Sequence, residues 1–294
     1  MSSFANLKRG RSDLSKLTKA IEATAQPAEG GGADDRFWKP SVDKAGNGMA
    51  VLRFLPAPQA DGDDALPWIR VFSHGFQGPG GWLIDNCLTT VNQNCPVCEA
   101  NSTLWNSGIE ANKNIARDRK RKLSYIANVL IVSDPSNKEN EGQIKLFKFG
   151  KKIFDKITEA MNPDPAFADE KPMNPFDMWE GANFKLKIRK VDGYQNYDKS
   201  EFESPSAIYD GDDDKLEELW KKEHSLKEFV EPKQFKSYDK LKERLDKVLG
   251  TAVPAAVATK AAAASLSEDD DVPFDTSGAD DEDLDYFKSL ANQD

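Results

Sequence analysis

The sequence is poor in histidine and cysteine, the residue types from which most zinc and redox sites are built. Among its 294 residues there are only two histidines and three cysteines. The odd number of cysteines argues against a disulfide framework, and the polar, amphipathic residues 1–25 do not have the pattern of a signal peptide. We therefore expect a reducing, intracellular compartment.

Long apolar runs and nucleotide or hydrolase motifs are also missing. No apolar run approaches the length of a membrane span, so we expect no membrane contact. There is no P-loop, no Gly-x-Gly-x-x-Gly at a strand–helix junction and no Gly-x-Ser-x-Gly. The sequence thus gives no case for an enzyme.

The negative charge is concentrated at one end of the chain. The formal net charge is −10, and residues 251–294 contain eleven acidic side chains against Lys260 and Lys288. The first 250 residues are therefore close to neutral and contain local basic clusters. These changes in composition predict a basic arm, a flexible linker, a core, an Ala-rich linker and an acidic tail, in residues 1–25, 26–35, 36–250, 251–267 and 268–294.

All three cysteines and one histidine lie within residues 74–98. The Cys-x2-Cys pair places two thiolates on one tight turn, and two further ligands complete the tetrahedron that Zn²⁺ favours. Because four protein ligands leave no position for water, we expect one structural zinc ion. Its predicted ligands are His74, Cys87, Cys95 and Cys98.

Two alternatives to a structural zinc site follow from the same residues. A zinc deaminase needs a Glu two residues after its histidine and a Pro before the first Cys of the pair. Here Phe76 takes the first position and Pro96 follows Cys95, so deamination is disfavoured. The simpler alternative is three buried cysteines and a surface histidine.

Apolar periodicity predicts a mainly β core with helices (α+β). The predicted strands are residues 49–55, 66–73, 123–132, 144–149 and 183–191, and the predicted helices are residues 151–161, 212–230 and 237–249. Residues 99–122 are interpreted as a mostly polar connection, and Tyr194 and Tyr197 as loop residues. His224, among charged neighbours, is interpreted as a solvated helix residue.

Basic side chains and aromatic rings are interleaved on or beside these strands. Residues 117–122 hold five bases in six positions, and cations alternate with apolar residues along 183–191. Single-stranded DNA requires this combination, because cations follow the phosphates while rings stack on bases at roughly 1–3 kcal/mol each. The alternative, which we expect for about half of these residues, is a solvated surface over core aromatics.

The acidic tail contains a cluster that ends in Pro273 and Phe274. It resembles the acidic tip with which bacterial single-stranded-DNA-binding proteins recruit partners, although Phe274 is internal here. The residues expected to bind partners are Asp269, Asp270, Asp271, Pro273 and Phe274. The alternative is a tail that only aids solubility.

Longer stretches resemble the single-stranded-DNA-binding (helix-destabilising) protein of T-even-type bacteriophages over nearly the whole chain. The matching stretches are residues 43–48, 53–56, 74–76, 95–98, 124–128, 139–142, 149–153, 179–184 and 250–253. The resemblance implies an OB-fold barrel with an inserted zinc subdomain and C-terminal helices. By position these parts are the barrel at about 36–72 and 123–205, the zinc subdomain at about 73–122 and the helical segment at about 206–250.

The resemblance also implies roles for individual residues. The expected DNA contacts are Arg53, Arg119, Lys120, Arg121, Lys122, Tyr125, Phe147, Lys148, Tyr194 and Tyr197. The expected self-association motif is Lys8, Arg9, Arg11 and Ser12 in the flexible basic arm. Two positions that hold tyrosines in the family hold Ile109 and Ala116 here.

The predicted function is cooperative, largely sequence-independent coating and protection of single-stranded DNA during replication, recombination and repair. The acidic tail would bind replication and recombination proteins. One alternative is a zinc-containing replication scaffold whose tail recruits partners and whose DNA contact is secondary. A sequence-specific regulator would need a basic recognition helix after Cys98, and residues 99–116 hold only one base.

Overall fold

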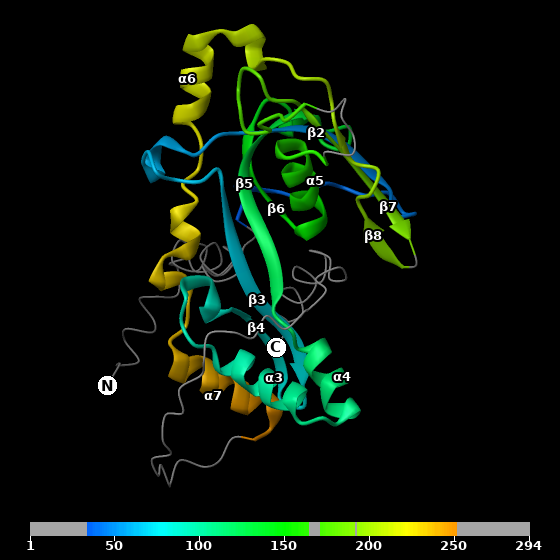
Figure 1. Ribbon diagram of the computed structural model, residues 1–294, viewed down its shortest axis with the longest axis vertical. Coiled ribbons are helices and arrows are strands. Elements are labelled where there is room, and N and C mark those ends of the chain that lie inside the picture. Colours follow the sequence, from blue (N-terminus) through cyan, green and yellow to red (C-terminus); the bar gives the residue numbers. More distant parts are fainter. Residues whose placement is uncertain (1–33, 165–170, 192, 252–294) are drawn as a thin grey trace, which may run out of the picture. The chain divides into compact units, whose positions relative to one another are not determined.

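The computed structural model describes residues 34–164, 171–191 and 193–251. Apart from Asp34 and Asp35, these residues belong to one compact unit that begins at Arg36. It is a mixed α+β structure in which five α-helices accompany a nine-stranded sheet (Figure 1). This agrees with the predicted class. The predicted self-association motif and partner-binding residues lie outside the described residues.

The sheet is built around strand β5, which is buried along most of its length. The strands are β1 (Phe37–Trp38), β2 (Gly48–Phe54), β3 (Trp68–Gly78), β4 (Gly81–Asn86), β5 (Lys122–Ser133), β6 (Ile144–Phe149), β7 (Phe184–Val191), β8 (Tyr194–Asn196) and β9 (Glu201–Phe202). Strand β5 pairs antiparallel with β2, β3 and β6, and β7 continues the sheet beyond β2. The continuous apolar run of β5 reflects this burial.

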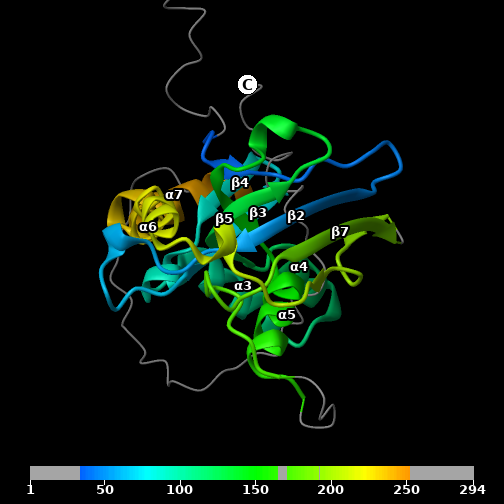
Figure 2. The same cartoon turned by 90° about the horizontal axis from the view of Figure 1, so that it is seen from above.

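Helix α5 (Lys151–Met161) covers the main core with Ile153 and Ile157. Figure 2 shows α5 against one side of the strands, with α6 (Asp213–Lys221) apart from it near β5. Helix α6 buries Leu216 and Leu219 in a separate cluster with Leu55 and Leu130. The predicted strands and α5 are all present, and β3 extends past the predicted end to Gly78.

A second core joins the β3–β4 hairpin to helix α7 (Tyr238–Leu249), which follows far later in the chain. The hairpin turn touches the C-terminal end of α7, where the Gly80 N–H donates to the Val248 carbonyl at 2.9 Å. A Cβ atom on Gly80 would lie 2.0 Å from the Lys247 carbonyl oxygen. Glycine at this position is therefore required for the hairpin to pack on α7.

Two sequence-based expectations about helices are wrong. Residues 99–122 are not a simple connection, because they contain most of α3 (Pro96–Asn106) and all of α4 (Glu110–Asp118). Pro96 stands in the first turn of α3, where proline favours helix initiation. Helix α3 buries only Pro96 and Val97, and α4 buries only Ala116, so neither sequence has a long stripe of large apolar residues.

The second error concerns residues 212–230. Helix α6 ends at Lys221, and only a short 3₁₀ turn, Lys227–Val230, follows. His224 is half-buried and non-helical, and its backbone bonds to the side chain of Asn128.

Among the described residues, no helix has both the length and the apolar character needed to cross a bilayer.

Candidate metal centre and nucleic-acid interface

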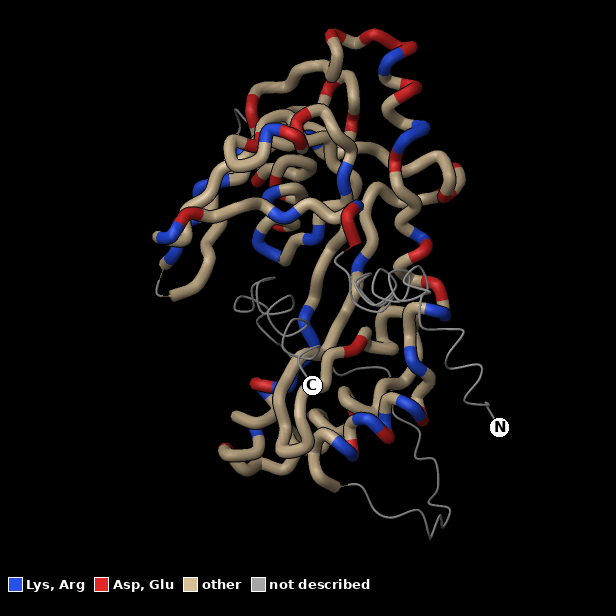
Figure 3. Tube along the Cα trace, turned by 180° about the vertical axis from the view of Figure 1, so that it is seen from behind, with Lys and Arg blue, Asp and Glu red and all other residues tan. Residues whose placement is uncertain are grey.

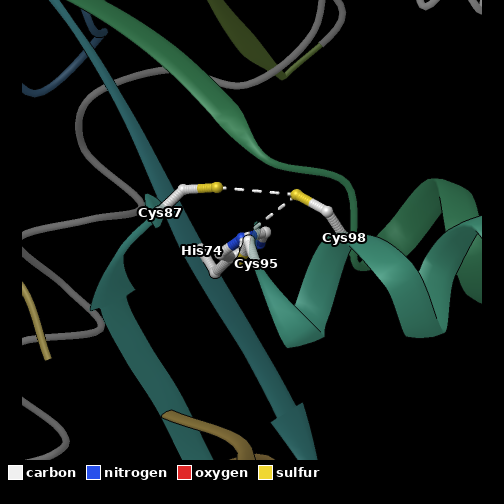
Figure 4. A group of neighbouring side chains, drawn as sticks. All are labelled: His74, Cys87, Cys95 and Cys98. Carbon is white, nitrogen blue, oxygen red and sulfur yellow. Dashed lines mark hydrogen bonds between the residues drawn. The ribbon is translucent and has the colours of Figure 1, made fainter. Parts of the chain in front are cut away.

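The four predicted metal ligands meet in space, although they come from three elements. His74 lies on β3, Cys87 follows β4, and Cys95 and Cys98 stand at the start of α3. Their ligand atoms all lie within 4.8 Å of one another. His74 Nε2 is 3.4 Å from Cys95 Sγ and 3.7 Å from Cys98 Sγ, and Cys87 Sγ is 3.5 Å from Cys98 Sγ (Figure 4).

This cluster is enclosed and its charges are strongly coupled. His74, Cys87 and Cys95 are buried. Burial opposes the charged imidazolium, but the Cys87 and Cys95 sulfurs outweigh it and raise the pKa of His74 to about 9. Hydrogen bonds from Cys87 and Cys98 lower the pKa of Cys95, whereas bonds to Cys87 and Cys95 raise that of Cys98.

The residues fit a tetrahedral metal ion. Three sulfurs and one imidazole nitrogen are the donor set of structural zinc sites, and a dication would let the three neighbouring thiols ionise together. Nε2 is the nitrogen of His74 that faces the sulfurs, and Nδ1 has no hydrogen-bond partner among the described residues. The cluster could thus hold one metal ion whose four coordination positions are all occupied by protein ligands.

Polar contacts extend from this centre to the basic run. The Thr89 hydroxyl lies 3.1 Å from Cys87 Sγ and accepts a 2.9 Å hydrogen bond from Arg121 Nη1. Thr90 holds β3 in place, because its Oγ1 accepts from the Phe72 N–H at 2.9 Å. The metal cluster and Arg121 therefore share one hydrogen-bonded neighbour.

A row of aromatic side chains lines one face of strands β3, β5 and β6, and most of these rings pack in the main core. Arg70 pairs with Tyr125, and Tyr125 pairs with Phe149, so these residues project to the same side of the sheet. Tyr125 stacks on Phe154 with ring centroids 3.9 Å apart and an interplanar angle of 2°. Trp68 makes an edge contact with Phe154, with ring centroids 5.5 Å apart.

Arginines lie directly over rings at the end of this face nearest the metal cluster. The guanidinium carbon of Arg121 is 4.3 Å from the centroid of Phe72, and that of Arg70 is 5.3 Å from the same ring. Arg119 stacks over Phe76 at 5.3 Å. Along α6 and α7, by contrast, basic and acidic positions alternate (Figure 3). The basic character of the ring-lined face is thus local.

Several predicted DNA-contact residues lie in or next to this region. Arg119 and Arg121 stack on rings, and Lys120 and Lys122 are half-buried beside them. Tyr194 lies on β8 rather than in a loop and is 67% exposed. Tyr197 is half-buried, and its hydroxyl donates to Gln195 Oε1 at 2.7 Å.

The structure corrects the placement of Arg53, which is 1% exposed. Its Nη2 donates to the carbonyls of Asp177 at 2.8 Å and Ser206 at 2.9 Å. Burial lowers the pKa of its guanidinium, an effect that the charge of Asp177 opposes. Arg53 ties two loops to the sheet and does not reach the surface on which we expected it.

Three further predicted contacts are placed differently from the expectation. Phe147 is 3% exposed and Tyr125 is 8% exposed, because both rings pack in the main core. Lys148 pairs with Ile126, whereas Phe147 pairs with Ala127, so the two side chains point to opposite faces. Period-2 alternation accounts for both observations.

Other residues of this face were missed by the sequence reasoning. Arg70 is exposed and Phe72 is half-buried, and both lie on β3 beside Tyr125 and Leu123. The sequence contained a signal for this face, because Trp68, Arg70 and Phe72 stand at every second position of a predicted strand and therefore project to the same side. Of the two positions that lack family tyrosines, Ile109 is 57% exposed and Ala116 is 1% exposed.

Comparison with known proteins gives a consistent family. Residues 46–249 match the model of the family described as gp32 DNA-binding-protein-like. The chain is 40% identical over 234 residues to the single-stranded DNA-binding protein of Enterobacteria phage T4, covering 78% of this chain and 75% of that protein. It is 38% identical over 258 residues to the single-stranded DNA-binding protein of Enterobacteria phage T2, covering 86% and 83%.

The family and these relatives are named for binding and not for catalysis, in agreement with the expectation of a non-enzyme. The match to the family model covers the metal cluster and the ring-lined face together. The chain belongs to the gp32-like family of DNA-binding proteins.

Proposed function

We propose that this protein binds single-stranded DNA through the part of β3 that carries Arg70 and Phe72 and through the basic run that precedes β5. The observation that carries the proposal is that two arginines, Arg70 and Arg121, both lie over the ring of Phe72. Guanidinium groups neutralise phosphates while nearby rings stack on unpaired bases. Arg119, Lys120, Lys122 and Tyr194 extend this contact set.

Zinc is the ion that we propose for the His74 and three-cysteine cluster, as one structural ion. Held by these four side chains, it would link β3, the turn at Cys87 and α3. The residues themselves then hold Thr89 and Arg121 beside Phe72. Because such sites couple metal binding to folding, loss of the ion weakens DNA binding through loss of structure.

The wider proposal follows the family relationship. The sheet would form an OB-fold barrel, with the metal-binding part inserted between its strands, and Arg53 and Phe147 would support it from inside. Lys8, Arg9, Arg11 and Ser12 would mediate cooperative self-association, and residues 268–294 would recruit replication and recombination proteins. The protein would act inside the infected bacterial cell, protecting single strands during replication, recombination and repair.

The test is a comparison of affinities for oligo-dT, duplex DNA and RNA of equal length across a salt series. A single-strand coating protein binds oligo-dT most tightly, and its affinity falls by about 0.7 log units per log unit of salt for each phosphate neutralised. Equal, weak binding to all three would instead favour a scaffold whose DNA contact is secondary. Metal analysis of the purified protein should give one zinc per chain.

A further inference from the structure

A tryptophan lies at the surface beside the basic run, with cations over its ring. Trp105 is half-buried in the last turn of α3. The guanidinium carbon of Arg117 is 5.3 Å from its ring centroid, and Lys113 Nζ is 5.8 Å away. Lys113 and Arg117 are four residues apart on α4, so they share one face of that helix.

The cations over this ring are charged side chains of α4. Trp105 is not a member of the hydrophobic clusters of the described residues, and the buried residue of α4 is Ala116. Its cationic neighbours form salt bridges with the exposed carboxylate of Glu110. The nitrogen–oxygen distance is 2.8 Å for Arg117 and 3.9 Å for Lys113. The half-buried ring of Trp105 therefore lies among charged side chains at the surface.

The position of Trp105 continues the proposed DNA-binding face. Asn101, one helical turn earlier on α3, donates from its side-chain amide to the carbonyl of Arg119 at 2.6 Å. Residues four apart lie on the same side of a helix, so Trp105 and Asn101 both face the segment that carries Arg119. Arg119 and Arg121 in turn stack on Phe76 and Phe72.

We propose that Trp105 is a stacking site for one unpaired nucleobase, with Lys113 and Arg117 binding the phosphates on either side of it. The inference rests on the proposed single-strand binding and assigns it an additional subsite on the α3–α4 hairpin. Stacking is tolerant of base identity, because every base has a π face. The two cations exchange Glu110 for phosphate oxygens, to which the Arg117 guanidinium can donate two parallel hydrogen bonds.

The experiment measures the affinity of full-length, zinc-loaded Trp105→Leu for two oligomers of equal length, oligo-dT and an abasic deoxyribose-phosphate chain. Leucine keeps the apolar contact and removes the ring. We expect oligo-dT binding to weaken about fivefold or more and abasic binding to stay within about twofold. Trp179→Leu, at a 48% exposed tryptophan on another part of the unit, is the matched control and should bind both oligomers as wild type does.

Further variants separate stacking from structure. Trp105→Tyr should retain most of the oligo-dT affinity, and Trp105→Met should not, so their difference isolates the ring even where leucine unfolds the hairpin. Trp105→Leu or Trp105→Met with wild-type affinity for oligo-dT overturns the proposal. So does an equal loss for both oligomers with unchanged zinc content and melting temperature. Failure of the wild-type protein to prefer oligo-dT over duplex would instead reject the proposed function itself.

Discussion

The side chain of Asn128 closes a two-way hydrogen-bonded bridge with the backbone of His224. Asn128 Nδ2 donates to the His224 carbonyl at 2.8 Å, and the His224 N–H donates to Asn128 Oδ1 at 3.0 Å. Asn128 is fully buried in β5, so its amide has no access to water. The bridge attaches the segment after α6 to the centre of the sheet, 96 residues away in sequence.

Asn128→Ala should therefore destabilise the protein strongly. It leaves two backbone groups of a half-buried segment without partners, at about 1–3 kcal/mol each. We expect a loss of about 2–4 kcal/mol in the free energy of unfolding, measured by urea denaturation. Asn128→Asp can make both contacts only as the protonated acid, so its loss should be smaller at low pH than at neutral pH. An alanine variant as stable as wild type would contradict the bridge.

Glu223, next to this bridge, is a buried carboxyl group without a hydrogen-bond partner for either oxygen among the described residues. Burial, reinforced by the charge of buried Asp61, raises its pKa from 4.5 to about 9. The folded protein therefore holds a proton that the unfolded chain releases above pH 4.5. Its contribution to stability is complete below that pH and is lost as the pH rises towards 9.

Glu223→Gln should remove this pH dependence. Between pH 5 and pH 9, the unfolding free energy of the wild type should fall relative to the variant by at most about 1.4 kcal/mol per pH unit. The measurement is thermal or urea unfolding across that range, with Glu218→Gln at an exposed position of α6 as control. Parallel pH profiles for wild type and Glu223→Gln would show that Glu223 is ionised in the folded state.

The metal cluster could be predicted because its chemistry is local. Its four ligands fall within residues 74–98, and thiol and imidazole side chains have few other reasons to gather at such a spacing. Strand β5 could be predicted because a continuous apolar run signals burial on both faces. In both cases the deciding information lies within one short stretch of the chain.

The fate of Arg53 could not be predicted, because its hydrogen-bond partners lie 124 and 153 residues further along the chain. An arginine in an apolar strand can lie in a row of basic residues at the surface, or it can be buried and donate to backbone carbonyls. Only the tertiary structure distinguishes these two environments. The docking of α7 on the β3–β4 hairpin has the same origin. Its close approach at Gly80 depends on a contact between distant segments.

Arg53 and Arg121, two arginines of the predicted DNA site, should now differ in experiment. Arg53→Met leaves the Asp177 and Ser206 carbonyls unpaired, so we expect a loss of about 3 kcal/mol or more in stability. Arg121→Ala removes an exposed side chain, with a change within about 0.5 kcal/mol. Only Arg121→Ala should weaken oligo-dT binding per folded molecule and lower the salt dependence by about 0.7. The opposite pattern would restore Arg53 as a contact.

Thr89 should couple the metal centre to the DNA-binding face. Its hydroxyl contacts Cys87 Sγ and accepts from Arg121, so Thr89→Val, which keeps the shape and removes the hydroxyl, breaks both contacts. We expect zinc affinity, measured by competition with a chelator, to fall about tenfold, as is typical for loss of a ligand's hydrogen-bond partner.

The same variant should bind oligo-dT several-fold more weakly even when saturated with zinc, because Arg121 loses the acceptor that holds its guanidinium beside the Phe72 ring. Thr89→Ser restores a hydroxyl at the same position and should recover both properties, which separates the hydrogen bonds from a packing effect of the methyl group. If Thr89→Val lowers zinc affinity alone, the metal and the DNA-binding face act independently, and Arg121 is held by its ring contact without help from Thr89.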